Sequence, residues 1–154
     1  MLFREDIEAP TVETMHLEGV KVLVVDDDAD TCHMLKFALK KHGASVETVT
    51  SASEALRALA EEKPEVLIAD INMPGEDGYS LIKRVRLLPD NRLSSIPAVA
   101  VTAMTRAEDT ERALSAGFQM HLPKPIDISE LVESIARLVS RSSGLENVRQ
   151  VVPN

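Results

Sequence analysis

Short apolar runs alternate with longer amphipathic stretches along most of the chain. The runs cover residues 22–25, 45–49, 66–69, 98–101 and 118–122. After each run, apolar residues recur with the spacing of one helix face. Such an alternation of strands and helices is typical of α/β proteins with a parallel sheet. The pattern therefore predicts a doubly wound (βα)5 fold, a three-layer sandwich around a central parallel sheet of five strands.

The runs differ in how completely apolar they are. The first, third and fourth are almost continuously apolar, as expected of parallel strands that are buried on both faces. The fifth alternates, and Gln119 and His121 form its polar side. This alternation predicts an edge strand with one face nearer to water.

Capping motifs mark the expected beginnings of three helices. The pairs are Ser51 with Glu54, Thr105 with Glu108, and Asp127 with Glu130. Gly43 and Gly117 follow helical stretches and supply helix stops.

The ends of the chain lack a sustained period. Residues 1–19 contain five acidic residues: Glu5, Asp6, Glu8, Glu13 and Glu18. We interpret 1–19 as a tail or linker, 20–141 as one domain, and 142–154 as a polar C-terminal tail in which no output domain is visible.

Composition limits the function classes. At 154 residues and 44% hydrophobic content the chain suits one compact domain, and its net charge of −8 argues against a nucleic-acid partner. We find no signal peptide and no apolar run of the ~18 residues that a membrane helix needs, so we expect a cytoplasmic protein without membrane contact. Cys32 is the single cysteine, which excludes an internal disulfide and a cysteine zinc cage, and we expect it to be a buried helix residue.

Polar residues follow four of the predicted strands at the point where each strand ends. They are Asp26, Asp27 and Asp28 after the first strand, Asp70 after the third, Thr102 after the fourth and Lys124 after the fifth. Ligands of an open parallel sheet bind beyond the carboxyl ends of its strands, so these side chains are expected to meet. Clustered carboxylates need a cation, and oxygen ligands select a hard ion such as Mg²⁺. A carboxylate can also form an acyl phosphate, so the site suits a phosphoryl group.

Each of these residues has a plainer interpretation. Asp28 and Asp30 are better explained as caps of the following helix. If the other polar residues at the strand ends are left aside, Asp70 is an ordinary turn residue and Thr102 an ordinary loop residue. Lys124 is less ordinary, because the prolines on both sides of it make a stiff turn in which an X-Pro bond can be cis.

Four segments resemble the signature blocks of receiver domains in two-component response regulators: VLVVDDDAD, VLIADINMPGEDGY, AVAVTAM and HLPKP. They occur in the family's order and spacing between about Gly19 and Ser140. The resemblance implies a flavodoxin-like, CheY-like fold and a regulatory phosphoacceptor domain, not a turnover enzyme. Its partner would be a histidine kinase or a histidine phosphotransfer domain. The wording MPGEDGY and AGFQMHLPKP is most like the C-terminal receiver of hybrid sensor histidine kinases, and a stand-alone regulator is the alternative.

The resemblance also implies a role for each site residue. Asp70 would be the phosphoacceptor. The Mg²⁺ ligands would be Asp26, Asp27, Asp70 and the backbone carbonyl of Asn72. Thr102 would bind a phosphoryl oxygen and shift inward, and Lys124, followed by a cis Lys124–Pro125 bond, would pair with the acceptor carboxylate or phosphate.

Two positions depart from the family or are specific to this chain. The switch position on the fifth strand is commonly Tyr or Phe but is His121 here, which would either act as the switch or remain a partly exposed edge residue. Met104 would place an apolar side chain near the phosphate entry and slow the approach of water. A homodimer stays open, because the relevant helix faces carry mixed charge.

Two other function classes deserve a test. An aspartate-nucleophile phosphatase of the haloacid dehalogenase type uses a D-x-D motif, which Asp26 to Asp28 contains, but a large cap domain is lacking. A docking module that has lost phosphorylation is the other class, although all key positions are filled.

Overall fold

The computed structural model describes residues 17–103 and 106–143. The strands are β1 (Lys21–Val25), β2 (Ser45–Val49), β3 (Val66–Asp70), β4 (Ala98–Thr102) and β5 (Met120–Pro123). The helices are α1 (Ala29–Lys40), α2 (Ala52–Glu62), α3 (Gly78–Arg86), α4 (Asn91–Ser94), α5 (Ala107–Ala116) and α6 (Ile128–Ser143). All strand pairs are parallel, in the order β2-β1-β3-β4-β5. This is the flavodoxin-like order, and it confirms the predicted fold.

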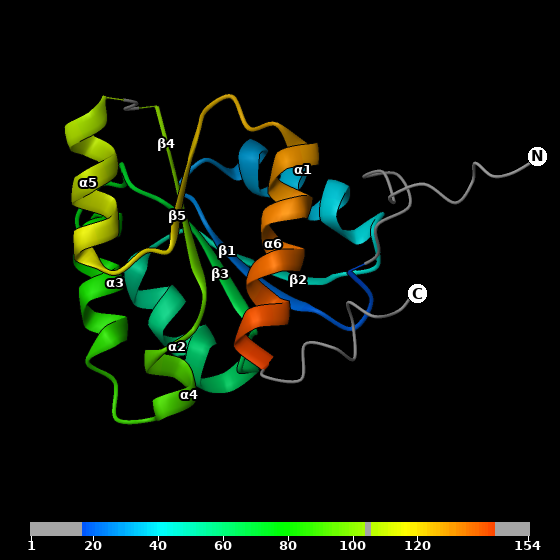
Figure 1. The fold of residues 1–154 in the computed structure, drawn as a ribbon, viewed down its shortest axis with the longest axis horizontal. Helices are drawn as coiled ribbons and strands as arrows, with labels where there is room; N and C mark the ends of the chain where they lie inside the picture. The colour runs from blue at the N-terminus through cyan, green and yellow to red at the C-terminus, as the bar shows by residue number, and fades with distance from the viewer. Residues whose placement is uncertain (1–16, 104–105, 144–154) are drawn as a thin grey trace, which may run out of the picture.

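Helices cover both faces of the sheet (Figure 1): α1 and α6 lie on one face, and α2, α3 and α5 on the other. Successive residues of a strand point to opposite faces, so each strand contributes to two cores. In β1, Leu23 and Val25 pack toward α2 and α3, whereas Val22 and Val24 pack toward α1 and α6. The sheet therefore separates two apolar layers that are almost free of aromatic residues.

The burial of the strands agrees with the pattern of the runs. β1, β3 and β4 are the three central strands, and their residues are buried apart from Lys21. β5 lies at one edge, where Leu122 is buried and His121 is half-buried. The prediction of an edge strand with one wetter face is confirmed.

Two of the three predicted helix starts are confirmed. Ser51 Oγ accepts a hydrogen bond from the Glu54 N–H at 3.2 Å, and Asp127 Oδ1 accepts one from the Glu130 N–H at 3.1 Å. The start of α5 is one residue later than predicted: its N-cap is Arg106, which makes no side-chain capping bond. Thr105, like Met104, lies outside the described residues.

The single-turn helix α4 was not predicted. It begins because Asp90 Oδ1 accepts hydrogen bonds from the backbone N–H groups of Arg92 and Leu93, at 2.9 and 3.4 Å. The Leu93 side chain then enters the core on the α2 and α3 face. A motif this short has no helical periodicity of its own, since its only anchor is one buried leucine. Within the described residues, no helix is both long enough and apolar enough to cross a membrane.

Candidate functional site

Three carboxylates meet at the carboxyl ends of β1 and β3. Asp26, Asp27 and Asp70 each place one carboxylate oxygen within 4.8 Å of the others. β1 and β3 are neighbours in register, with Val25 opposite Ala69, so the residues that end these strands emerge at the same level. Asp26 and Asp70 are 3% and 4% exposed, whereas Asp27 is exposed. The predicted convergence of these acids is present in the structure.

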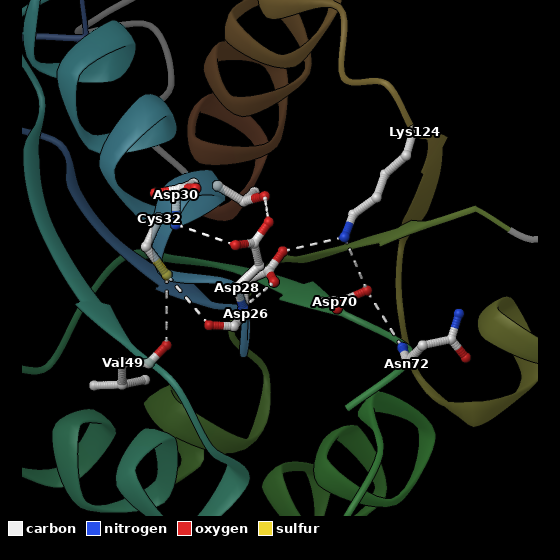
Figure 2. A network of polar contacts seen from close by, with 9 residues as sticks. Asp26, Asp28, Asp30, Cys32, Val49, Asp70, Asn72 and Lys124 are labelled. Carbon is white, nitrogen blue, oxygen red and sulfur yellow. Dashed lines mark hydrogen bonds and ion pairs between the residues drawn. The ribbon is translucent and has the colours of Figure 1, made fainter. Parts of the chain in front are cut away.

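Lys124 completes the cluster from the other side (Figure 2). Its Nζ lies 3.3 Å from Asp26 Oδ2 and 3.4 Å from Asp70 Oδ1. Its backbone N–H donates to the carbonyl oxygen of Thr102 at 2.9 Å, and the Lys124–Pro125 peptide bond is cis as expected. Burial alone would lower the pKa of Lys124, but the charges of the two carboxylates outweigh it and raise that pKa. Lys124 is therefore an ammonium held between two buried acids.

The negative charge of the cluster exceeds the positive charge. Burial, followed by the neighbouring charge of Asp26, raises the pKa of Asp70 to about 6. The Lys124 ammonium and the Asn72 N–H, which donates to Asp70 Oδ1 at 3.3 Å, act in the opposite direction. The cluster thus holds three carboxylates and one ammonium, which contacts two of them, and a further cation would stabilise this arrangement. Carboxylate oxygens are the donors that a hard divalent ion such as Mg²⁺ prefers, so the residues fit such an ion.

The backbone holds Asp26 in place. Its N–H donates to the Val49 carbonyl at 3.1 Å, and its carbonyl oxygen lies 3.3 Å from the Cys32 thiol (Figure 2). Its Oδ1 accepts from the Asp28 N–H at 2.9 Å. Cys32 is 3% exposed, which confirms it as a buried helix residue, although its contact with Asp26 was not foreseen.

Asp28 caps α1, as its plainer interpretation predicted. Its Oδ1 accepts from the Asp30 N–H at 3.2 Å, and its Oδ2 accepts from the Thr31 hydroxyl at 2.8 Å. Asp30 lies in the first turn of α1 and is exposed. These two acids stabilise the N-terminus of the helix next to the cluster.

Thr102 and His121 lie on the adjacent strands β4 and β5. Thr102 is 1% exposed at the end of β4. His121 is half-buried, and its Nδ1 lies 3.4 Å from the Thr110 hydroxyl on α5. The histidine thus contacts the helix that covers the edge of the sheet.

Gly78 is a site residue that the motif MPGEDGY contained but that was not singled out. A Cβ at this position would lie 2.6 Å from the Asp70 carbonyl oxygen and 2.9 Å from the Ile71 Cα. The Gly78 N–H also donates to the Ile71 carbonyl at 2.9 Å. The first turn of α3 therefore packs directly on the backbone that carries Asp70.

Arg86 was missed entirely. Its guanidinium donates to the carbonyl oxygens of Ser94, Ile96 and Gly117 at 2.6–3.0 Å. It also donates to Gln119 Oε1 at 3.1 Å, and the same oxygen accepts from the Ala98 N–H at 2.7 Å. A lysine or arginine in the last turn of a helix ordinarily indicates a solvated face, so the sequence carried no signal for this network.

Known proteins resemble the chain over this whole region. A model of the response regulator receiver domain matches residues 22–136. An uncharacterized 14.6 kDa protein of Leptolyngbya boryana is 44% identical over 77% of this chain and 89% of its own length. Hybrid signal transduction histidine kinase D of Dictyostelium discoideum is 31% identical over 86% of this chain, which spans 9% of the kinase. The receiver domain of Francisella response regulator 1452 has a TM-score of 0.74 at 28% identity, over 80% of this chain and 99% of the solved one. The chain belongs to the response regulator receiver domain family.

Proposed function

We propose that this receiver domain accepts a phosphoryl group on Asp70 from a phospho-histidine, in a Mg²⁺-dependent step. The observation that carries the proposal is the position of the Lys124 ammonium between Asp26 and Asp70, at 3.3 and 3.4 Å. The buried Asp70 carboxylate thus lies between an ammonium and two further carboxylates, which supports a metal-assisted phosphoryl transfer at this position. The donor would be a histidine kinase or a histidine phosphotransfer domain, and the cytoplasm is the compartment we expect.

The transfer itself is a displacement at phosphorus. An oxygen of the Asp70 carboxylate forms the new bond to phosphorus while the bond between phosphorus and the donor imidazole nitrogen breaks. The electron pair of that bond returns to the imidazole, which takes a proton from water. Asp70 is ionised above its pKa of about 6 and is therefore a nucleophile at neutral pH.

The neighbouring residues have separate roles in this proposal. The proposed Mg²⁺ ligands are Asp26, Asp27, Asp70 and the backbone carbonyl of Asn72, and the bound ion would neutralise phosphoryl oxygens. Lys124 would exchange its contact with the Asp70 carboxylate for one with a phosphoryl oxygen. The Thr102 hydroxyl would donate to another phosphoryl oxygen.

The proposed readout passes through the edge of the sheet. In the β4–β5 register, Thr102 is opposite Pro123, and His121 is two residues before Pro123 on β5. His121 contacts Thr110 on α5. An inward shift of Thr102 would alter the space available to His121 and so bias the position of α5.

The test is phosphorylation by a small donor. Incubation with acetyl phosphate and Mg²⁺ should add one phosphoryl group, which intact-protein mass spectrometry detects as a mass increase. Addition of EDTA, or the substitution Asp70→Asn, should abolish this increase. Retention of the label in Asp70→Asn, with loss in Asp26→Asn, would favour the phosphatase-type chemistry instead. Absence of any thermal shift with Mg²⁺ and beryllofluoride would favour a docking module without phosphorylation.

A further inference from the structure

Helix α1 presents an apolar strip to solvent. Its inner face is buried through Cys32, Leu35 and Leu39. On the outer face, Phe37 is 69% exposed and Met34 is 43% exposed. These are two of only four large hydrophobic side chains that are exposed within residues 17–103 and 106–143. Side chains three residues apart are neighbours on a helix surface, so Met34 and Phe37 lie side by side on the exposed face of α1.

The same face is basic, although the protein as a whole is strongly acidic. A shallow groove on it is lined by His33, Lys36, Phe37, Lys40 and Lys41. The Lys41 ammonium lies 5.4 Å from the centre of the Phe37 ring. Within the described part of the chain, Lys36 and Lys40 have no ion pair with a carboxylate. The groove therefore suits an occupant that is both acidic and apolar.

The chain itself enters the domain at the end of this helix. The Leu17 N–H donates to the His42 carbonyl at 2.6 Å, and the Leu17 side chain is 1% exposed. His42 follows directly after Lys40 and Lys41. Leu17, to which residues 1–16 are attached, therefore lies beside the basic end of the groove. In Figure 1, α1 lies on the same face of the sheet as α6.

The composition of residues 1–16 complements that of the groove. Residues 1–16 contain four acidic residues and one arginine, namely Glu5, Asp6, Glu8, Glu13 and Arg4. Apolar residues occur among them, namely Leu2, Phe3, Ile7, Val12 and Met15. An extended chain covers about 3.3 Å per residue and a helix rises about 1.5 Å per residue, so a few extended residues are enough to run from Lys41 to Met34.

We propose that residues 1–16 bind the outer face of α1, with carboxylates on Lys36, Lys40 and Lys41 and apolar side chains on Met34 and Phe37. Because the segment is tethered next to the groove, its effective concentration is on the order of millimolar, and a weak contact is sufficient for occupancy. Apolar burial and ion pairing act together, so high salt weakens the complex without abolishing its apolar part. The proposal does not depend on the phosphorylation of Asp70.

The experiment is nuclear magnetic resonance on the full chain, in which backbone amides of residues 1–16 and of α1 are followed at 50 and 500 mM NaCl. The double charge reversal Glu8→Lys with Glu13→Lys should release residues 1–16 from α1. Their heteronuclear NOE values should then fall, and the amide resonances of residues 33–41 should shift. Adding Lys36→Glu and Lys40→Glu should restore both signals. Glu61→Lys with Glu62→Lys, two exposed acids at the end of α2, is the control with the same change in net charge and should leave both signals unaltered.

Two outcomes would overturn the proposal. One is that residues 1–16 have the same NOE values in the unsubstituted chain and in the Glu8→Lys, Glu13→Lys chain, with no change in the amides of residues 33–41. The other is that these amides shift with protein concentration and sedimentation shows a dimer, which would assign the groove to a second copy of the chain. Neither outcome bears on whether Asp70 accepts a phosphoryl group.

Discussion

The ammonium nitrogen of Lys124 lies 3.4 Å from Oδ1 of Asp70, although β3 and β5 are not neighbours in the sheet. The lysine reaches across the end of β4, where its own backbone N–H is bound to the Thr102 carbonyl. This contact joins three strands at one point. The Lys124 ammonium also reduces the mutual repulsion of the Asp26 and Asp70 carboxylates.

Lys124→Met should destabilise the metal-free protein at pH 7 by roughly 1–3 kcal/mol, because it leaves buried carboxylates without their ammonium partner. Urea denaturation in EDTA measures the loss. Saturating Mg²⁺ should recover part of it, since the ion supplies the missing positive charge. Lys83→Met, a change at an exposed position on α3, should have little effect and serves as the control. Equal stability of Lys124→Met and the unsubstituted protein in EDTA would contradict the prediction.

Asp70→Asn should stabilise the metal-free protein at pH 7 by about 1–2 kcal/mol. The pKa of Asp70 is raised from 3.8 to about 6, so its ionised form opposes folding at neutral pH. Well below the unfolded pKa of 3.8 the group is protonated in both folded and unfolded states, and the gain should vanish. The gain should grow between about pH 4 and pH 6 and level off above the folded pKa. Denaturation curves at pH 4, 5, 6 and 7 test this sign. A stability gain of Asp70→Asn that increases as the pH falls would contradict a raised pKa of Asp70.

Asp27→Asn should weaken Mg²⁺ binding at least about tenfold, because it removes one of three converging carboxylates. The thermal midpoint gives the readout: a ligand at one hundred times its Kd stabilises the folded state by about 2.7 kcal/mol. Asp30→Asn is the matched control, an exposed acid in the adjacent first turn of α1. Equal Mg²⁺ titrations for the two variants would show that Asp27 is not a ligand of the proposed metal site.

Gly78→Ala should destabilise the protein by about 2–4 kcal/mol, because its Cβ would meet the Asp70 carbonyl oxygen at 2.6 Å, and backbone cannot move aside cheaply. Gly75→Ala, in the loop just before α3, is the comparison. Gly75 has a φ of +82° but no atom within 4 Å of an added Cβ, so only backbone strain of about 1–2 kcal/mol should result. A smaller loss for Gly78→Ala than for Gly75→Ala, in guanidinium denaturation, would contradict the close approach.

Arg86→Lys should destabilise the protein nearly as much as Arg86→Ala, by roughly 2–3 kcal/mol. An ammonium cannot reproduce the fork that reaches the Gly117, Ser94 and Ile96 carbonyls together. Arg84→Ala, on the same helix, removes an exposed ion pair with Glu76 and should cost less than about 1 kcal/mol. Full rescue of stability by lysine at position 86 would show that charge alone matters there.

The sequence determined the elements and the edge of the sheet at which the site lies. Apolar runs and helical spacing depend on neighbouring residues, so β1, β3 and β4 and the longer helices of the alternation followed from periodicity, whereas the single-turn α4 did not. Parallel strands end at one edge, which brought Asp26, Asp27, Asp70, Thr102 and Lys124 into one prediction.

Only the tertiary structure decided which atoms meet. The raised pKa of Asp70, the bridge that Lys124 makes between Asp26 and Asp70, the Cys32 contact and the approach of Gly78 all depend on distances set by packing. Arg86 shows the reason most clearly. Three of its partners are backbone carbonyls, which every residue carries, so no residue type in the sequence could predict them. Only the folding of the chain brings these carbonyls within hydrogen-bonding distance of one guanidinium.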